Sequence, residues 1–352
     1  MTAVTALGAA ICDAIDIPDG NSEPAPTPAP TVPAEPVKYG AIIEPAEPVI
    51  TAEEPIKGWG AINRKAGQSI VQSNLWASDN WIGWKANGTE SNPLEEVRCE
   101  DVLLERFGPY IVMRGAPVID LRRIKSVEAG TSSYGIGFIK CTDTIGSFRA
   151  VDLIFDGEGI AQNANDAFAA VCLWGKDQGS DICTDWQIER FMLRDCLMAT
   201  GDNYANADGI SVERGHDQGL IEHGLIDNCS DAGIDCKGYD VRINQVDIAN
   251  CRQSLKLWDA SNRIGRIISR TPRFAHILAA SDNEQVEDEP IVIDQLELYG
   301  DPGRTVVAFE GQKNVVIKSL VHHEAEISEL KMFTKTNKAE GSTLWVNGIQ
   351  VL

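Results

Sequence analysis

The sequence has little positive charge and no long apolar run. Lysine and arginine together number 31 against 52 aspartates and glutamates, which gives a formal net charge of −21 at pH 7. A surface of that sign repels phosphates and anionic headgroups, so neither a nucleic acid nor an anionic membrane is an expected partner unless the charge reverses locally. No run of 18 apolar residues occurs, so a transmembrane helix is not expected.

The nine cysteines lack the spacing of a metal or redox site. There is no Cys-X-X-Cys pair and no Cys/His zinc spacing, and we expect neither a metal nor a cofactor. Cys196, Cys229 and Cys251 instead occupy equivalent positions of a repeat, and Cys99 and Cys236 also fall on apolar phases. Small thiols are common in protein cores, so these cysteines are interpreted as reduced core residues.

The N-terminal region lacks the features of a secretory signal. No basic residue precedes Lys38, and Asp13 and Asp16 interrupt the apolar start. A signal has a positive beginning and an unbroken apolar stretch, so residues 1–20 are predicted to be a short anchor segment that docks on a partner. Residues 21–56 are rich in Pro, Ala and Glu and predict an extended polyproline-type linker, not a packed element.

A repeat of apolar positions dominates the rest of the chain. Trp186 to Cys196 carries apolar side chains at positions 1, 3, 6, 8 and 11, and Val241 to Cys251 has the same spacing. Looser copies begin at residues 97, 219, 291 and 315. Two period-2 runs separated by a slip of one residue indicate two strands joined by a bend, because a helix would repeat every 3.6 residues.

A second short apolar run follows most copies and completes one repeating unit. From Asp208 onward these runs start at steps of 24, 21, 21 and 31 residues, a period typical of solenoids. Two or three strands per unit, without a leucine-rich signature, predict an all-β right-handed parallel β-helix of about nine coils over residues 95–323. The second runs are 110–115, 170–174, 208–213, 232–237, 253–258, 274–279 and 305–310.

Residues that favour a tight bend recur at the ends of the coils. Asp195, Asn228 and Asn250 each stand one residue before the aligned cysteine. Asn and Asp tolerate the left-handed backbone of a tight bend. We therefore expect these bends to stack, with side chains bonded from one coil to the next.

Both ends of a solenoid expose apolar surface that must be covered. Residues 57–94 hold four of the eight tryptophans and are predicted to form the N-terminal cap, with an aromatic sugar-stacking patch as the alternative. Residues 324–352 are predicted to form the C-terminal cap, with a last strand at 343–348.

Strand phase separates side chains that point into the core from those that point outward. In the runs 208–213, 232–237 and 253–258 the inward positions are apolar, and stacking of the coils aligns the outward positions into two rows. The first row is Glu213, Lys237 and Trp258, extended by Arg114 and Trp174, and the second is Ser211, Asp235 and Lys256.

These rows form a candidate strip for binding a polysaccharide. Trp174 and Trp258 are suited to stacking on sugar rings, and Glu213 and Asp235 are a candidate catalytic carboxylate pair for glycoside hydrolysis. The turn that follows the first run adds His216 as a candidate substrate-binding residue, although a lone histidine in a glycine-rich turn is more often only a turn residue.

The lysines of the strip have two interpretations. Lys237 and Lys256 would neutralise an acidic sugar, or act as a base if the pKa of either were lowered. The alternative is a solvated outer face stabilised by stacked ion pairs, Glu213–Lys237 and Asp235–Lys256. Residues 237–273 carry eight Lys or Arg and three Asp, a local reversal that would either receive an anionic ligand or balance neighbouring coils.

The segment from Asn206-Ala-Asp-Gly-Ile-Ser to Leu257-Trp258 resembles the pectin-lyase-like right-handed β-helix superfamily, which includes polysaccharide lyases, glycoside hydrolases and bacteriophage tailspikes. The resemblance covers residues 95–322 and implies the fold more than the function. Asn206-Ala-Asp-Gly is similar to the Asn-Thr-Asp-Gly stretch of polygalacturonases, which implies a catalytic acid at Asp208. The family's Asp-Asp pair and Arg-Ile-Lys are absent, and Ser230-Asp231-Ala232-Gly233 stands where the pair would be.

Three functions fit these features. The first is a phage virion spike or adhesin, in which the β-helix binds host surface polysaccharide and the N-terminal segment contacts other virion proteins. Resemblance to phage spikes implies a homotrimer. Whether the protein also degrades the polysaccharide is left open. The second is a secreted or cytoplasmic bacterial polysaccharide lyase or glycoside hydrolase. The third is a purely structural virion component.

Overall fold

The protein is described by a computed structural model for residues 39–57, 62–65, 67–78, 84–87, 95–106, 111–114, 118–127, 138–142, 146–161, 168–174, 183, 185–199, 205–259, 261–280 and 289–352. All of them belong to the compact unit Glu35–Leu352. The predicted anchor segment, residues 1–20, lies outside the described residues, as does the first part of the predicted linker.

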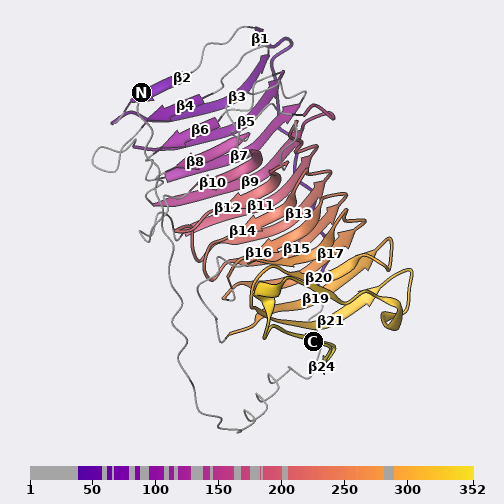
Figure 1. Ribbon diagram of the computed structural model, residues 1–352. Helices are drawn as coiled ribbons and strands as arrows, with labels where there is room; N and C mark the ends of the chain where they lie inside the picture. Colours follow the sequence, from indigo (N-terminus) through magenta and orange to yellow (C-terminus); the bar gives the residue numbers. More distant parts are fainter. Residues whose placement is uncertain are drawn as a thin grey trace, which may run out of the picture. The chain divides into compact units, whose positions relative to one another are not determined.

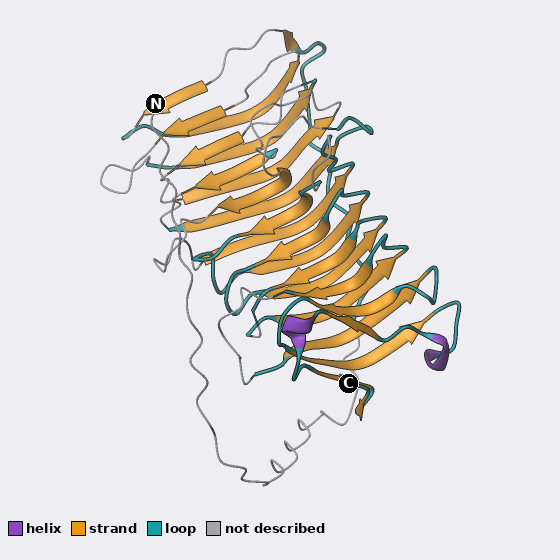
Figure 2. Ribbon diagram, in the orientation of Figure 1, coloured by secondary structure: helices purple, strands orange, loops and turns teal. Residues whose placement is uncertain are grey.

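Two sheets run side by side along the solenoid (Figures 1 and 2). Strands are parallel throughout, except for the antiparallel contact between β23 and β24. Sheet A has thirteen strands: β1 (Ile56–Lys57), β3 (Ile70–Ser78), β5 (Val97–Glu105), β7 (Val118–Val127), β9 (Ser147–Asp156), β11 (Asp185–Arg194), β13 (Leu220–Asp227), β15 (Arg242–Ala249), β17 (Arg263–Arg270), β19 (Ile291–Tyr299), β21 (Asn314–His322), β23 (Thr343–Val346) and β24 (Ile349–Gln350).

Sheet B has eleven strands, and each follows a strand of sheet A in the chain, so one strand of each sheet makes a coil. The described residues contain two 3-10 helices, η1 (Ile327–Glu329) and η2 (Asn337–Ala339), and no α-helix. The strands of sheet B are β2 (Ile62–Lys65), β4 (Trp84–Asn87), β6 (Ile111–Arg114), β8 (Ile139–Thr142), β10 (Phe168–Trp174), β12 (Ala207–Val212), β14 (Ala232–Cys236), β16 (Gln253–Leu257), β18 (Ala275–Ala279), β20 (Thr305–Phe309) and β22 (Phe333–Lys335).

The predicted parallel β-helix is confirmed, with nine strands of sheet A within residues 95–323, and it continues beyond these bounds. Eleven pairs of strands, β1–β2 to β21–β22, follow one another in the described residues. The added coils come from residues 57–94, because β3 pairs with β5 and β4 with β6 where we expected a cap. At the other end β23 matches the expected last strand, and β24 folds back on it.

The seven strands of sheet A from β3 to β15 bend in the middle, at the predicted slip of one residue. In β11 the bend residue is Arg190, with a φ of 51°, and in β15 it is Gln245, with a φ of 53°. The left-handed conformation costs a non-glycine residue on the order of 1 kcal/mol. We call the stacked bend residues of β3, β5, β7, β9, β11, β13 and β15 the bend ladder; they are Asn74, Asp101, Arg123, Asp152, Arg190, His223 and Gln245, all with φ between 50° and 62°.

The predicted stack of bends at the coil ends is also present. Asp195, Asn228 and Asn250 have φ values of 55°, 60° and 55°. Asn228 Nδ2 donates to Asp195 Oδ1 at 2.6 Å, and Thr271 Oγ1 donates to Asn250 Oδ1 at 2.7 Å. These bonds satisfy polar side chains from one coil to the next, as the sequence predicts.

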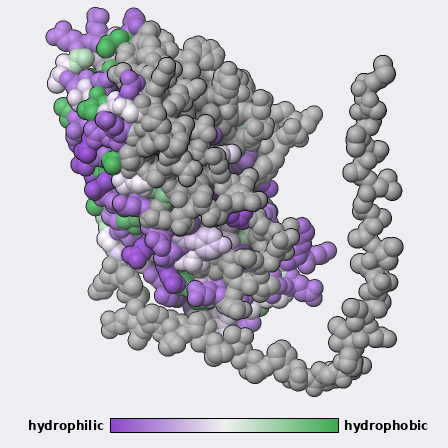
Figure 3. All heavy atoms as spheres, turned by 90° about the vertical axis from the view of Figure 1, so that its left-hand side faces the viewer, coloured by the Kyte–Doolittle hydropathy of each residue, from purple (hydrophilic) through white to green (hydrophobic). Residues whose placement is uncertain are grey.

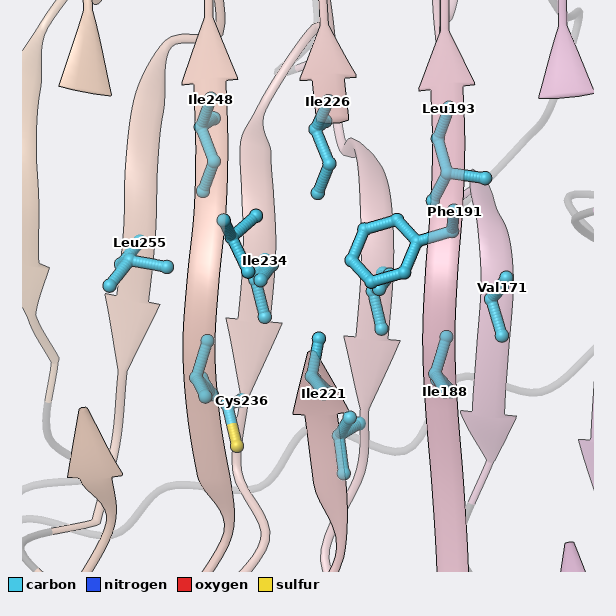
Figure 4. Close-up of a cluster of buried hydrophobic side chains, with 14 of the residues drawn as sticks. Val171, Ile188, Phe191, Leu193, Ile221, Ile226, Ile234, Cys236, Ile248 and Leu255 are labelled. Carbon is cyan, nitrogen blue, oxygen red and sulfur yellow. The ribbon is translucent and has the colours of Figure 1, made fainter. Parts of the chain in front are cut away.

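The core lies between the two sheets and repeats with the coils. Figure 4 shows Ile188, Ile226 and Leu255 among the apolar side chains that meet there. All eight cysteines within the described residues are buried and free, which confirms the prediction of reduced core thiols. In that part of the chain, no helix has the length and apolar character needed to cross a bilayer.

Residues 39–55 form an arm that crosses the outer side of sheet A before β1. Tyr39 Oη donates to Asp294 Oδ2 in β19 at 2.9 Å, and the N–H of Thr51 donates to Asn74 Oδ1 in β3 at 2.9 Å. The arm therefore reaches from a late coil back to an early one. Residues 39–55 contain no helix or strand, and their hydrogen bonds hold them against the solenoid, which corrects our expectation of an unpacked linker for this part.

Candidate functional site

The two predicted rows of sheet B are present in register. Ser211 in β12 pairs with Asp235 in β14, which pairs with Lys256 in β16. Glu213 follows β12, and its N–H donates to Leu173 O at 2.9 Å, so it continues the row of Trp174. Lys237 and Trp258 follow β14 and β16 in the same way, and Arg114 lies in the same row two coils before Trp174.

Asp235 is held by three side chains. Trp258 Nε1 donates to Asp235 Oδ1 at 2.7 Å, while Lys256 Nζ lies 3.1 Å and Lys237 Nζ 3.9 Å from Asp235 Oδ2. The Lys256 Nζ is also 5.2 Å from the centre of the Trp258 ring. A buried carboxylate needs such partners, because desolvation without them is costly.

Glu213 and Lys237 form the second predicted ion pair. Lys237 Nζ donates to Glu213 Oε1 at 2.6 Å, and Ser211 Oγ donates to the same oxygen at 3.1 Å. Burial lowers the pKa of Lys237, but Asp235 and Glu213 outweigh it and raise this pKa overall. Lys237 is therefore an ammonium group at neutral pH, which argues against its use as a general base.

Asp208 adds a carboxyl group near the start of β12, three positions before Ser211. It lies in β12, is only 3% exposed, and its Oδ1 accepts the Ala232 N–H at 2.8 Å. Burial, followed by the negative charges of Asp235 and Asp231, raises the pKa of Asp208 well above its ordinary value, and Lys256 opposes the shift. The cluster therefore favours the protonated form of Asp208.

Asp231 belongs to the same cluster, although sequence reasoning gave it no role. Its side chain is fully buried, Gln253 Nε2 donates to its Oδ1 at 2.6 Å, and Lys256 Nζ lies 3.8 Å from its Oδ2. The turn before β14 places it beside β12, since the Asp231 N–H donates to Ala207 O. The sequence feature that could have identified Asp231 is its position in the repeat, 23 residues after Asp208.

The second row is not the solvated face that the alternative interpretation supposed. Asp235 is 3% exposed and Ser211 7%. Glu213 and Lys237, with side chains 21% exposed, reach the surface. The candidate site thus has a buried ionic layer beneath a partly exposed row. Figure 3 shows one side of the molecule, where the described surface is mostly hydrophilic with a few hydrophobic residues among it.

Trp174 is the most exposed aromatic residue of the first row. It is 40% exposed, and Lys140 Nζ in β8 lies 4.1 Å from its ring centre. Trp258 stands three coils further along the row, a separation of about 14 Å at the spacing of parallel strands. The two rings bracket Glu213 and Lys237, so one side of the row combines two aromatic surfaces with an ion pair.

His216 is placed differently from the other candidates. It is fully buried and forms an isolated bridge with Cys183. Burial lowers the pKa of His216, against a smaller opposing effect of the Trp174 backbone. The buried imidazole lies in the turn after Glu213, outside both rows, which supports the interpretation of His216 as a turn residue.

The basic stretch 237–273 is largely neutralised within the fold. Arg266 Nε lies 2.6 Å from Glu297 Oε1, and Arg270 Nε lies 2.8 Å from Asp247 Oδ1. Both pairs join different coils, which favours the interpretation that these arginines balance neighbouring strands. Arg252, whose side chain is 39% exposed, is 3.7 Å from Asp231 and lies nearer the candidate site.

Within the described ranges, no group of three or more His, Cys, Asp or Glu side chains has the arrangement of a metal site. Comparisons with protein-family models, curated proteins and solved structures found no match to this chain.

Proposed function

We propose that this protein binds an extended polysaccharide along sheet B, as a pectin-lyase-like β-helix of the phage-spike type does. The observation that carries the proposal is the row Trp174, Glu213, Lys237 and Trp258, contributed by four successive coils. A solenoid presents equivalent positions at a regular spacing, which suits a ligand that is itself a repeating chain.

The chemistry of the row suits a sugar polymer. The apolar faces of Trp174 and Trp258 provide surfaces for sugar rings, and charged groups between them provide hydrogen bonds to hydroxyl or carboxylate groups. Asp235 accepts from Trp258 Nε1, so the indole ring is held in a fixed orientation before any ligand arrives. A preoriented ring loses little conformational entropy on binding.

A glycan array with the full-length protein tests the proposal, followed by titration of Trp174→Ala and Trp258→Ala with any glycan that binds. Each substitution should weaken binding by about tenfold or more, the loss expected for an interfacial aromatic anchor. Phe274→Ala is the matched control, because Phe274 is 39% exposed at the opposite end of the sheet B strands. Binding that survives both tryptophan substitutions, or no binding to any glycan, would refute the proposed surface.

Hydrolysis of the bound polysaccharide is a second candidate function, favoured by the acidic cluster. A general acid must be protonated at the working pH, and the raised pKa of Asp208 meets that requirement; because Asp208 is only 3% exposed, this function requires the ligand to reach beneath the partly exposed row. Glu213 is the carboxylate that is most open to solvent in this part of the row.

Product analysis by mass spectrometry tests this second function. Asp208→Asn keeps the acceptor for the Ala232 N–H and removes the proton donor, so it should abolish turnover while leaving binding intact. Asp235→Asn and Glu213→Gln should lower turnover as well. If a glycan is cleaved at the wild-type rate by all three variants, the cluster is structural only.

The virion location is part of the same proposal. It predicts that the protein co-purifies with phage particles and that removal of residues 1–22 releases it from them. A full-length protein that remains soluble and separate from particles during their purification would support the alternative of a bacterial polysaccharide-degrading enzyme. Particle association without any glycan binding would support a purely structural component.

A further inference from the structure

The arm shows a period of three residues in its burial. Tyr39, Ile42, Pro45 and Pro48 are half-buried, and the two residues between each successive pair are exposed. A β-strand would alternate with a period of two. A period of three is that of the polyproline II helix, which has three residues per turn, and the two prolines favour that conformation.

From Ile43 to Val49 the hydrogen bonds of the arm follow the same period, which ends at the bond from the Thr51 N–H to Asn74, two residues and one coil further on. The arm's N–H groups at Ile43, Ala46 and Val49 donate to the bend ladder, at distances of 3.4, 3.0 and 2.8 Å. The acceptors are His223, Asp152 and Asp101, in strands β13, β9 and β5 respectively. Each step of three arm residues therefore passes two coils.

The two repeats match in length. Three residues of polyproline II rise about 9.3 Å, and two coils of a parallel β-helix rise about 9.6 Å. The arm can therefore continue along the ladder without losing register. Glu47 contacts the coil between two acceptors, since Lys125 Nζ in β7 lies 2.7 Å from its carboxylate.

The bend ladder is built to present these acceptors. Arg123, from the coil after Asp101, donates to that carboxylate at 2.6 Å, and Arg190 donates to Asp152 at 2.7 Å. The bonds from Arg123 and Val49 keep the pKa of Asp101 low, and burial only partly opposes them. Burial raises the pKa of Asp152, but Arg190 and the Ala46 N–H outweigh it, so both acceptors are carboxylates at neutral pH.

We propose that the bend ladder is a docking groove for polyproline II segments with proline at every third position, filled in this protein by its own residues 43–49. The groove selects its occupant because three residues of a polyproline II helix rise by nearly the same length as two coils. The left-handed backbone of the ladder residues directs their side chains toward the N–H groups of the bound segment. This recognition is independent of the sheet B site and of any polysaccharide.

Residue-resolved hydrogen exchange on the full-length wild-type protein is the first test. The amides of Ile43, Ala46 and Val49 should exchange at least about tenfold more slowly than those of Glu44 and Glu47, because only hydrogen-bonded amides require local opening. Fast exchange throughout residues 39–55 would overturn the proposal. Protection with a period of two would also overturn it, because that pattern indicates strand pairing.

A pair of proline substitutions gives a matched second test in the full chain. Ala46→Pro removes the donor to Asp152 and should speed exchange at Ile43 and Val49 by about tenfold. Glu44→Pro introduces the same ring where no hydrogen bond is found within the described residues, and it should leave exchange at those two amides unchanged. Equal effects of the two substitutions would refute the ordered register.

Binding in trans tests the selectivity of the groove. A fluorescent peptide of residues 39–55 should bind the Ala46→Pro protein at least about tenfold more tightly than it binds the wild type, whose groove is occupied. The same peptide with one glycine inserted between Ala46 and Glu47 should lose that binding, because its second half would be out of step with the coils. Equal binding of the two peptides would show that the spacing selects nothing.

Discussion

Lys256 is the cation on which the acidic cluster of sheet B depends. Its Nζ lies 3.1 Å from Asp235 and 3.8 Å from Asp231, and its side chain is 13% exposed. The Asp235 side chain is 4% exposed and that of Asp231 is fully buried. Removing Lys256 would leave two carboxylates with insufficient compensation in a region that water does not reach.

Lys256→Met keeps most of the side-chain stem beside Trp258 and removes only the charge. Loss of one partner from a buried ion pair costs about 3–5 kcal/mol, much of it the desolvation of the partner left behind. We therefore expect the urea midpoint to fall by about 1 M or more, using a slope of about 3 kcal/mol per M. The effect should grow as the pH rises above about 4, because the remaining carboxyl groups then gain charge in the unfolded state.

Lys318→Met is the matched control. Lys318 Nζ lies 2.8 Å from Asp294 Oδ1, but both side chains are 30% exposed, so its loss should cost less than about 1 kcal/mol. Asp235→Asn added to Lys256→Met should recover part of the lost stability, because it removes one of the unpaired charges. The reasoning is refuted if the two lysine substitutions have equal effects, or if the double variant is no more stable than Lys256→Met.

Three further outcomes can be measured on the same protein. Gly224→Ala should lower the free energy of unfolding by about 1–3 kcal/mol, because the added Cβ would lie 1.9 Å from the Phe191 ring. Phe191→Leu in the same protein should restore part of the lost stability, because the smaller side chain leaves room for the methyl group. Burial, with smaller effects of nearby positive groups, lowers the pKa of His276 to about 3. Since the unfolded histidine titrates near 6.5, stability should be full above that pH and fall as the pH drops toward 3, with a weaker fall in His276→Asn. In the native protein the eight buried thiols should not react with a thiol reagent, and their rapid labelling without denaturant would contradict the core assignment.

The parts of the fold that were predictable follow from local periodicity. In the copies from β3 to β15 the slip of one residue corresponds to one left-handed residue. The stacking of Ser211, Asp235 and Lys256 follows from strand phase alone. The same spacing also occurs in 118–127 and 147–156, which are not among the predicted copies and form β7 and β9. Their alternation is less clear, because Ser126 occupies one inward position and β9 is buried on both faces.

Other features depend on contacts between distant segments and leave no local mark. The hydrogen bond between Ala46 and Asp152 joins residues 106 positions apart in the sequence. Composition could therefore indicate an extended linker, but it could not indicate which surface of the solenoid the linker contacts. The depth of the Asp235 site likewise depends on what covers sheet B, whereas strand phase only indicates that the side chain points away from the core. Strand phase therefore predicted correctly that the Asp235 side chain points away from the core, but it wrongly predicted that this side chain is exposed to solvent.

The match between the arm and the coils limits how such a molecule can lengthen in evolution. Duplication of a single coil would move all later ladder residues by one coil, which is half of the length spanned by three arm residues. The next N–H group of the arm would then have no ladder acceptor opposite it. A duplication of two coils, accompanied by a three-residue insertion in the arm, would preserve every bond. Homologues of different length should therefore differ in even numbers of coils along the arm-covered stretch.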